Sequence, residues 1–217
     1  NQDIYEGEWV GGRKNGKGKM TYSNGTFYEG SWKKGLKSGK GKVCFVNGDE
    51  YEGTFKEGAI SGEGIYTFTD GKIYKGTFKE GMLNGKGELI FQNQDKYFGN
   101  FVDSQAHGQG VYHFKDKGQY EGEFENGTFN GQGNYFFSNL GDVYKGSWKE
   151  GQMHGEGIYI FANKERYEGE WFKGNKHGKG KMIFKNEDVY DGNWEMNQKI
   201  GFGEYRTNDG LQYKGQF

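Results

Sequence analysis

The sequence predicts an all-β fold of tandem β-hairpins that join into one long antiparallel sheet. Three observations predict it. A tyrosine recurs every 23 residues, with one interval of 24. Two residues after each tyrosine stands a glycine, and two residues after that glycine stands a tryptophan or phenylalanine. No segment shows the 3.6-residue apolar period of an amphipathic helix.

The repeats cover nearly the whole chain, and self-similarity at a fixed period is the signature of a repeat architecture. Nine complete repeats each contain a later G-x-G pair, and a tenth is partial. We predict that residues 1–217 form a single repeat array and, because the chain starts without methionine and stops inside a repeat, a segment of a longer protein. The repeats begin at Tyr5, Tyr28, Tyr51, Tyr74, Tyr97, Tyr120, Tyr144, Tyr167 and Tyr190, and the partial one at Tyr213.

Each repeat reads as two strands and two turns. The Tyr-x-Gly-x-Trp/Phe segment alternates with a period of two, which predicts a strand with its rings on one face. The segment after the G-x-G pair alternates in the same way, as in Gly64 to Phe68. About six residues rich in Gly, Asn and Lys separate the strands, which is typical of a hairpin loop. Ser104 and Asn197 replace the loop glycine, and we expect them to loosen their turns.

Composition excludes several classes of protein. The 217 residues include 42 glycines and no proline, yet 18% are aromatic, which disordered chains are not. A formal net charge of −1 gives no reason to expect a nucleic-acid partner. The single cysteine, Cys44, rules out an internal disulfide framework. No apolar run approaches the length of a membrane-spanning helix.

We expect no catalytic residues, no cofactor-binding residues and no metal ligands, and therefore no enzyme and no cofactor. Gly11 to Gly18 resembles a phosphate-binding loop, but a strand rather than a helix follows it. His107, His154 and His177 stand at turn positions of different repeats, too far apart to share a metal ion.

The pattern Y-x-G-x-W/F-x-x-G-x-x-x-G-x-G resembles the MORN repeat, from Tyr5 to Phe217. The resemblance implies an elongated, twisted, single-layer, solenoid-like sheet with a shallow groove lined by aromatic rings. It also implies a cytoplasmic scaffold in a cytoskeletal or ciliary assembly, protein partners such as an amphipathic helix, and dimerisation through terminal repeats. Family members are linked to phosphoinositides, and any enzyme activity lies in a separate domain.

The aromatic face is the first predicted binding site. A single sheet does not cover its own rings, so we expect a stripe partly open to solvent that holds a partner, in line with the binding of helices in apolar grooves. The predicted groove residues are Tyr28, Trp32, Tyr51, Phe55, Tyr74, Phe78, Tyr144, Trp148, Tyr167, Trp171, Tyr190 and Trp194.

A basic cluster in the first two repeats carries the alternative, a peripheral membrane module that binds anionic phospholipid. Its residues are Arg13, Lys14, Lys17, Lys19, Lys33, Lys34, Lys37, Lys40 and Lys42. The second residue of each repeat is charged, as in Glu6, Glu29 and Lys75. We interpret that row, opposite the rings, as a solvated surface.

Overall fold

A computed structural model describes residues 2–217, which fold into strands joined by turns. No helix able to cross a membrane occurs among these residues. The prediction of an all-β fold is confirmed. The strands are β1 (Ile4–Val10), β2 (Arg13–Thr21), β3 (Phe27–Lys33), β4 (Leu36–Cys44), β5 (Glu50–Lys56), β6 (Ala59–Thr67), β7 (Ile73–Lys79), β8 (Met82–Ile90), β9 (Lys96–Val102), β10 (Gln105–Phe114), β11 (Gly118–Glu125), β12 (Thr128–Phe137), β13 (Asp142–Lys149), β14 (Gln152–Ile160), β15 (Arg166–Phe172), β16 (Asn175–Ile183), β17 (Val189–Glu195), β18 (Gln198–Arg206) and β19 (Gln212–Gln216).

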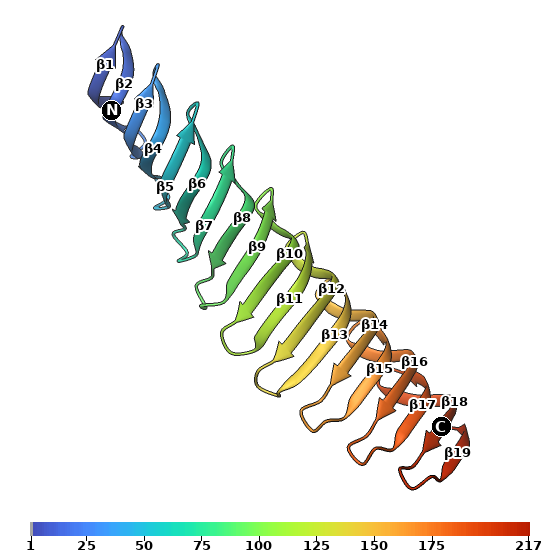
Figure 1. The fold of residues 1–217 in the computed structure, drawn as a ribbon. Helices are drawn as coiled ribbons and strands as arrows, with labels where there is room; N and C mark the ends of the chain where they lie inside the picture. The colour runs from blue at the N-terminus through green and yellow to red at the C-terminus, as the bar shows by residue number, and fades with distance from the viewer. Residues whose placement is uncertain (1) are drawn as a thin grey trace. The chain divides into compact units, whose positions relative to one another are not determined.

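The chain divides into two compact units, Asn1–Ala106 and His107–Phe217. Within each unit every strand pairs antiparallel with its neighbours in the chain, so that hairpins lie side by side (Figure 1). The first unit contains β1 to β9 and the first two residues of β10, and the second contains the rest of β10 and β11 to β19. The prediction that consecutive hairpins join through their strands is confirmed within each unit. That all 217 residues act as one array stays a prediction.

The hairpin loops are shorter than predicted. Lys33 ends β3 and Leu36 begins β4, so two residues rather than six form the loop. Lys34 and Gly35 both have positive φ, 52° and 88°, as a type I′ turn requires. The predicted loop was too long because the polar residues after the turn are strand residues on a solvated surface.

Ser104 and Asn197 do not loosen their turns. Both adopt the left-handed conformation that glycine would take, with φ of 68° and 71°. Their side chains each accept a hydrogen bond from the previous repeat, Ser104 from the Leu83 amide at 3.1 Å and Asn197 from the Lys176 amide at 2.9 Å. These bonds offset the backbone strain of a non-glycine residue and connect neighbouring hairpins.

Within each unit, the hairpins whose first strand begins a repeat carry a bulge after the strand glycine. Gly30 pairs with Gly41, whereas Trp32 pairs with Lys37, so the register shifts between Gly30 and Trp32. A shift after the strand glycine recurs in other repeats of both units, for example between Gly146 and Trp148. A bulge bends a strand and increases its twist, so it re-aims the large ring that follows.

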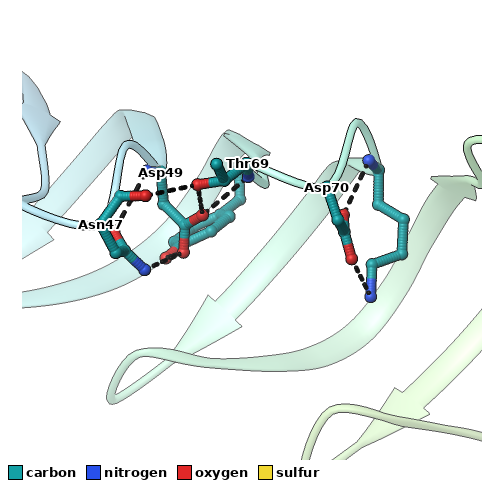
Figure 2. Close-up of polar contacts among 6 residues, drawn as sticks. Asn47, Asp49, Thr69 and Asp70 are labelled. Atoms are coloured by element: carbon teal, nitrogen blue, oxygen red, sulfur yellow. Dashed lines mark hydrogen bonds and ion pairs between the residues drawn. The ribbon is translucent and has the colours of Figure 1, made fainter.

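A second polar feature connects repeats and is shown in Figure 2. The Asp49 carboxylate accepts hydrogen bonds from the Tyr66 hydroxyl at 2.8 Å, the Thr69 amide at 2.8 Å and the Asn47 amide group at 2.9 Å. Burial raises the pKa of this carboxyl, but the hydrogen bonds outweigh burial and lower the pKa to about 2. Asp49 therefore fastens the turn before its repeat to the turn after it.

The aspartate contact recurs in alternate repeats. Asp142 accepts from Tyr159 and the Ala162 amide, and Asp188 accepts from Tyr205 and the Asn208 amide. The corresponding positions in the even-numbered repeats are Thr26, Lys72, Gly118, Glu165 and Leu211. The structural period of the array is thus two repeats.

Candidate functional site

The predicted aromatic groove is not open to solvent, and that expectation was wrong. All twelve of its residues are buried: Tyr28, Trp32, Tyr51, Phe55, Tyr74, Phe78, Tyr144, Trp148, Tyr167, Trp171, Tyr190 and Trp194. The six tyrosines among them are 0% exposed. Whether a partner binds over this face stays untested, but its rings form the core.

Ring stacking between repeats buries these side chains. The Tyr28 ring meets the Trp32 ring of its own repeat edge-on at 5.1 Å and the Phe55 ring of the next repeat at 4.9 Å. Edge-on pairs of this kind add to the stabilisation that burial provides. The pattern repeats along each unit, and the tyrosines that lie between two large rings in the same way are Tyr5, Tyr51, Tyr74, Tyr120, Tyr144, Tyr167 and Tyr190. A single layer buries its rings because each hairpin covers those of the next.

The strand glycines make room for the tyrosines. A Cβ atom on Gly41 would lie 2.5 Å from Cε2 of Tyr28, so any larger residue would collide with the ring. The Tyr28 hydroxyl donates to the Ser31 carbonyl at 2.9 Å. All ten repeat tyrosines make the equivalent bond, at 2.8–3.1 Å. Burial, chiefly, raises the pKa of Tyr28 to about 12, which keeps its hydroxyl a donor.

The predicted basic cluster divides among three places. Lys14 and Lys37 lie over buried rings, with Lys37 Nζ 5.0 Å from the centre of Tyr28. Burial and the nearby Lys14 lower the pKa of Lys37. Arg13, Lys33 and Lys34 are exposed around the hairpin turns. Lys17, Lys19, Lys40 and Lys42 line a groove on the opposite face of the sheet. The nine residues therefore do not form one surface.

That groove lies in the first unit and has a volume of about 1250 Å³. Its floor is the bare backbone of the strand glycines, because their missing side chains would point toward the tyrosines on the other face. The side chains directly before and after each glycine form its walls. The lining residues are Glu6, Lys17, Gly18, Lys19, Phe27, Glu29, Gly30, Lys40, Gly41, Lys42, Glu52, Gly53, Thr54, Glu63, Gly64, Ile65, Gly76, Thr77 and Lys86.

The regular spacing of the strand glycines is the feature of the sequence from which this groove could have been predicted. We interpreted the charged row that includes Glu6 and Glu29 as a solvated surface, yet these residues are one wall of the groove. Lys42 forms an ion pair with Glu50 at 2.8 Å. The positive charge of Lys42, in the groove wall, is therefore balanced by a carboxylate of the adjacent strand.

Reactive groups are scattered over the described part of the chain. The Cys44 thiol donates to Glu50 at 3.3 Å, and burial together with Glu50 raises its pKa, which disfavours the reactive thiolate. Among residues 2–217, no group of three or more His, Cys, Asp and Glu residues is placed to hold a metal ion.

Comparison with known proteins agrees with the repeat geometry. The MORN repeat model matches residues 5–27, 28–50, 51–73, 74–96, 97–119, 120–141, 144–166, 167–189 and 190–212. No curated protein matches the sequence. The TCP10 domain of Danio rerio CPAP, in complex with a peptide of Danio rerio STIL, is similar in fold, with a TM-score of 0.55 and 14% identity over 100% of both chains. Another structure of that domain has a TM-score of 0.48 and 10% identity, covering 98% of this chain and 94% of its own. With nine repeats matched across residues 5–212, this chain belongs to the MORN-repeat family.

Proposed function

We propose that the chain is a non-catalytic scaffold that binds a partner protein along the glycine-floored groove of its first unit, within a cytoskeletal or ciliary assembly. The observation that carries the proposal is the division of labour between the two faces. Stacking between repeats buries the rings on one face of the sheet. The opposite face, whose floor is glycine backbone, carries an open groove of about 1250 Å³. Open grooves of this kind are characteristic of binding surfaces.

Two further observations support a binding role. A domain of similar fold has been solved with a peptide bound, so a sheet of this architecture is compatible with peptide recognition. The described residues supply neither a metal cluster nor an activated thiol that would favour an enzyme. The membrane-lipid alternative is weaker, because the nine basic residues do not face a common plane.

A pull-down with the full-length protein tests the proposal. Thr54 lines the groove, and the equivalent position carries glutamate in three other repeats, so Thr54→Arg should fold while filling the groove. We expect Thr54→Arg to lose partners that wild type retains. Thr128→Arg, exposed in the second unit, is the matched control and should retain them. A wild-type protein that captures nothing above a bead control would overturn the scaffold, and an unchanged partner set with Thr54→Arg would overturn the groove.

A further inference from the structure

We propose that the groove binds an extended acidic segment of the partner, whose carboxylates occupy main-chain amide sites that other repeats fill with a glutamate of their own. This inference rests on the proposed function and adds the chemistry of the bound segment. Each such site, called an amide seat below, consists of a left-handed glycine and the backbone N–H of the residue after it.

Three repeats show what an amide seat binds. The Lys17 amide donates to the Glu8 carboxylate at 2.7 Å, and the Gln132 amide donates to Glu123 at 2.9 Å. The Lys179 amide donates to Glu170, also at 2.9 Å. A carboxylate is the occupant each time, in agreement with the tendency of such backbone concavities to bind anions.

The glycine of the seat fits the carboxylate closely. A Cβ atom on Gly178 would lie 2.6 Å from Cδ of Glu170, and one on Gly131 would lie 2.7 Å from Cδ of Glu123. Both glycines have positive φ, 58° and 83°. The carboxylate thus packs against the bare glycine while it accepts the following N–H.

Repeats two, three and four keep the seat and lack the glutamate. Their glycines, Gly39, Gly62 and Gly85, have φ of 68°, 80° and 77°, and the following amides belong to Lys40, Glu63 and Lys86. The place of the glutamate is taken by Ser31, Thr54 and Thr77, which carry no carboxylate. The groove extends over these repeats: Lys40, Thr54, Glu63, Thr77 and Lys86 all line it.

The surroundings favour the first of the three seats. Its amide belongs to Lys40, and Lys17 and Lys19 line the groove beside it. At the third seat, whose amide belongs to Lys86, the Thr77 hydroxyl takes up the space, since a Cβ atom on Gly85 would lie 2.6 Å from its Oγ1. The amide of the middle seat belongs to Glu63, whose own negative charge repels a carboxylate of the partner. We therefore expect the first seat to contribute most to binding an acidic segment.

Strand spacing sets the pattern of the segment. Seats in successive repeats lie two strands apart, about 9.6 Å. An extended chain in the polyproline II conformation rises about 3.1 Å per residue and has three residues per turn, so every third side chain points the same way. Carboxylates on every third residue would therefore match successive seats. A fluorescent peptide of three Glu-Ser-Ser units is the probe, and the same peptide with glutamine in place of glutamate is its control.

Fluorescence anisotropy with the full chain at low salt measures the affinity. We expect the glutamate peptide to bind about tenfold more tightly than the glutamine peptide, the effect of one charge-assisted hydrogen bond. Ser31→Glu fills the first seat from within and should weaken the glutamate peptide about tenfold. It should also fold normally, because Glu8, Glu123 and Glu170 occupy the same position in their repeats. Ser23→Glu, exposed in a turn between repeats, adds the same charge and should leave the affinity unchanged.

Two outcomes overturn the inference. Equal binding of the two peptides would mean that carboxylates are not recognised, and equal loss in Ser31→Glu and Ser23→Glu would reduce the effect to net charge. If either occurs while Thr54→Arg still loses the captured partners, the groove remains the binding site and the carboxylate chemistry alone is wrong.

Discussion

Replacing Gly41 with alanine tests the packing of the Tyr28 ring over the backbone of a strand glycine. The new methyl group would lie 2.5 Å from Cε2 of Tyr28, and the opposing Gly30 backbone and the next hairpin leave the ring no free space. Tyr28 would have to leave its position between Trp32 and Phe55. The substitution should therefore act through the tyrosine rather than through the backbone, since φ at Gly41 is not in the left-handed region.

The expected cost follows from what Tyr28 would lose. Overpacking a well-packed core costs about 1–3 kcal/mol. Loss of the hydroxyl bond to the Ser31 carbonyl adds about 1 kcal/mol. We expect Gly41→Ala to lower the free energy of unfolding by about 3 kcal/mol in total. Gly35→Ala is the matched control in the same hairpin: it meets nothing within 4 Å, and its positive φ alone should cost about 1–2 kcal/mol.

Urea unfolding followed by tryptophan fluorescence measures both variants, with hydrogen exchange to localise the effect. A double-mutant cycle with Tyr28→Ala decides the mechanism, because removal of the ring should make Gly41→Ala nearly neutral. If Gly41→Ala costs no more than Gly35→Ala, or costs as much with Tyr28 absent, then ring packing over glycine does not explain the glycine pattern.

The other predictions concern the core, the hydrogen bonds that Asp49 accepts, and the chain ends. Trp171→Ala should destabilise the protein by about 3–5 kcal/mol, because the ring is buried and its Nε1 donates to the Gly157 carbonyl; a folded, unchanged variant in thermal unfolding would contradict this. The folded-state pKa of Asp49 is about 2, below its unfolded value of about 3.9, so its stabilisation is present above pH 4 and is lost as the pH falls toward 2. Asp49→Asn should therefore make unfolding less sensitive to acid than Asp116→Asn does, because Asp116 is an exposed turn residue. Equal pH profiles of the two variants would refute the stabilising role of the Asp49 hydrogen bonds. Trp9 is 55% exposed, whereas its equivalents in repeats two to nine are buried, so we expect dimerisation through terminal repeats. Light scattering that reports a monomer, or a dimer unaffected by Trp9→Ser, would count against it.

Periodicity predicted the strands well because each hairpin is a local structure with its own turn chemistry. The alternation around Tyr28 and Gly30 determines which side chains share a face, and the pairing of Gly30 with Gly41 follows from a two-residue turn. The length of that turn was misjudged, because polar residues such as Lys37 read as loop residues although they lie in a strand.

Exposure could not be predicted from the same pattern. A row of rings along one sheet face indicates either a binding stripe or a self-covering core, and the choice depends on how far each hairpin bends over the next. The bulge after Gly30 and the contact between Tyr28 and Phe55 decide it, and both are tertiary features. The amide seats were missed for a related reason, since Glu8 and Ser31 differ in sequence but not in backbone geometry.

The alternation of Asp49, Asp142 and Asp188 with repeats that lack the aspartate sets a rule for shortening or extending this protein. Excising one repeat would place two repeats with the aspartate contact, or two repeats without it, next to each other. Excising two consecutive repeats would keep the order of linkages intact. The protein is therefore modular in pairs, and a minimal stable fragment should be sought in multiples of two hairpins, cut so that each aspartate keeps the turn to which it bonds.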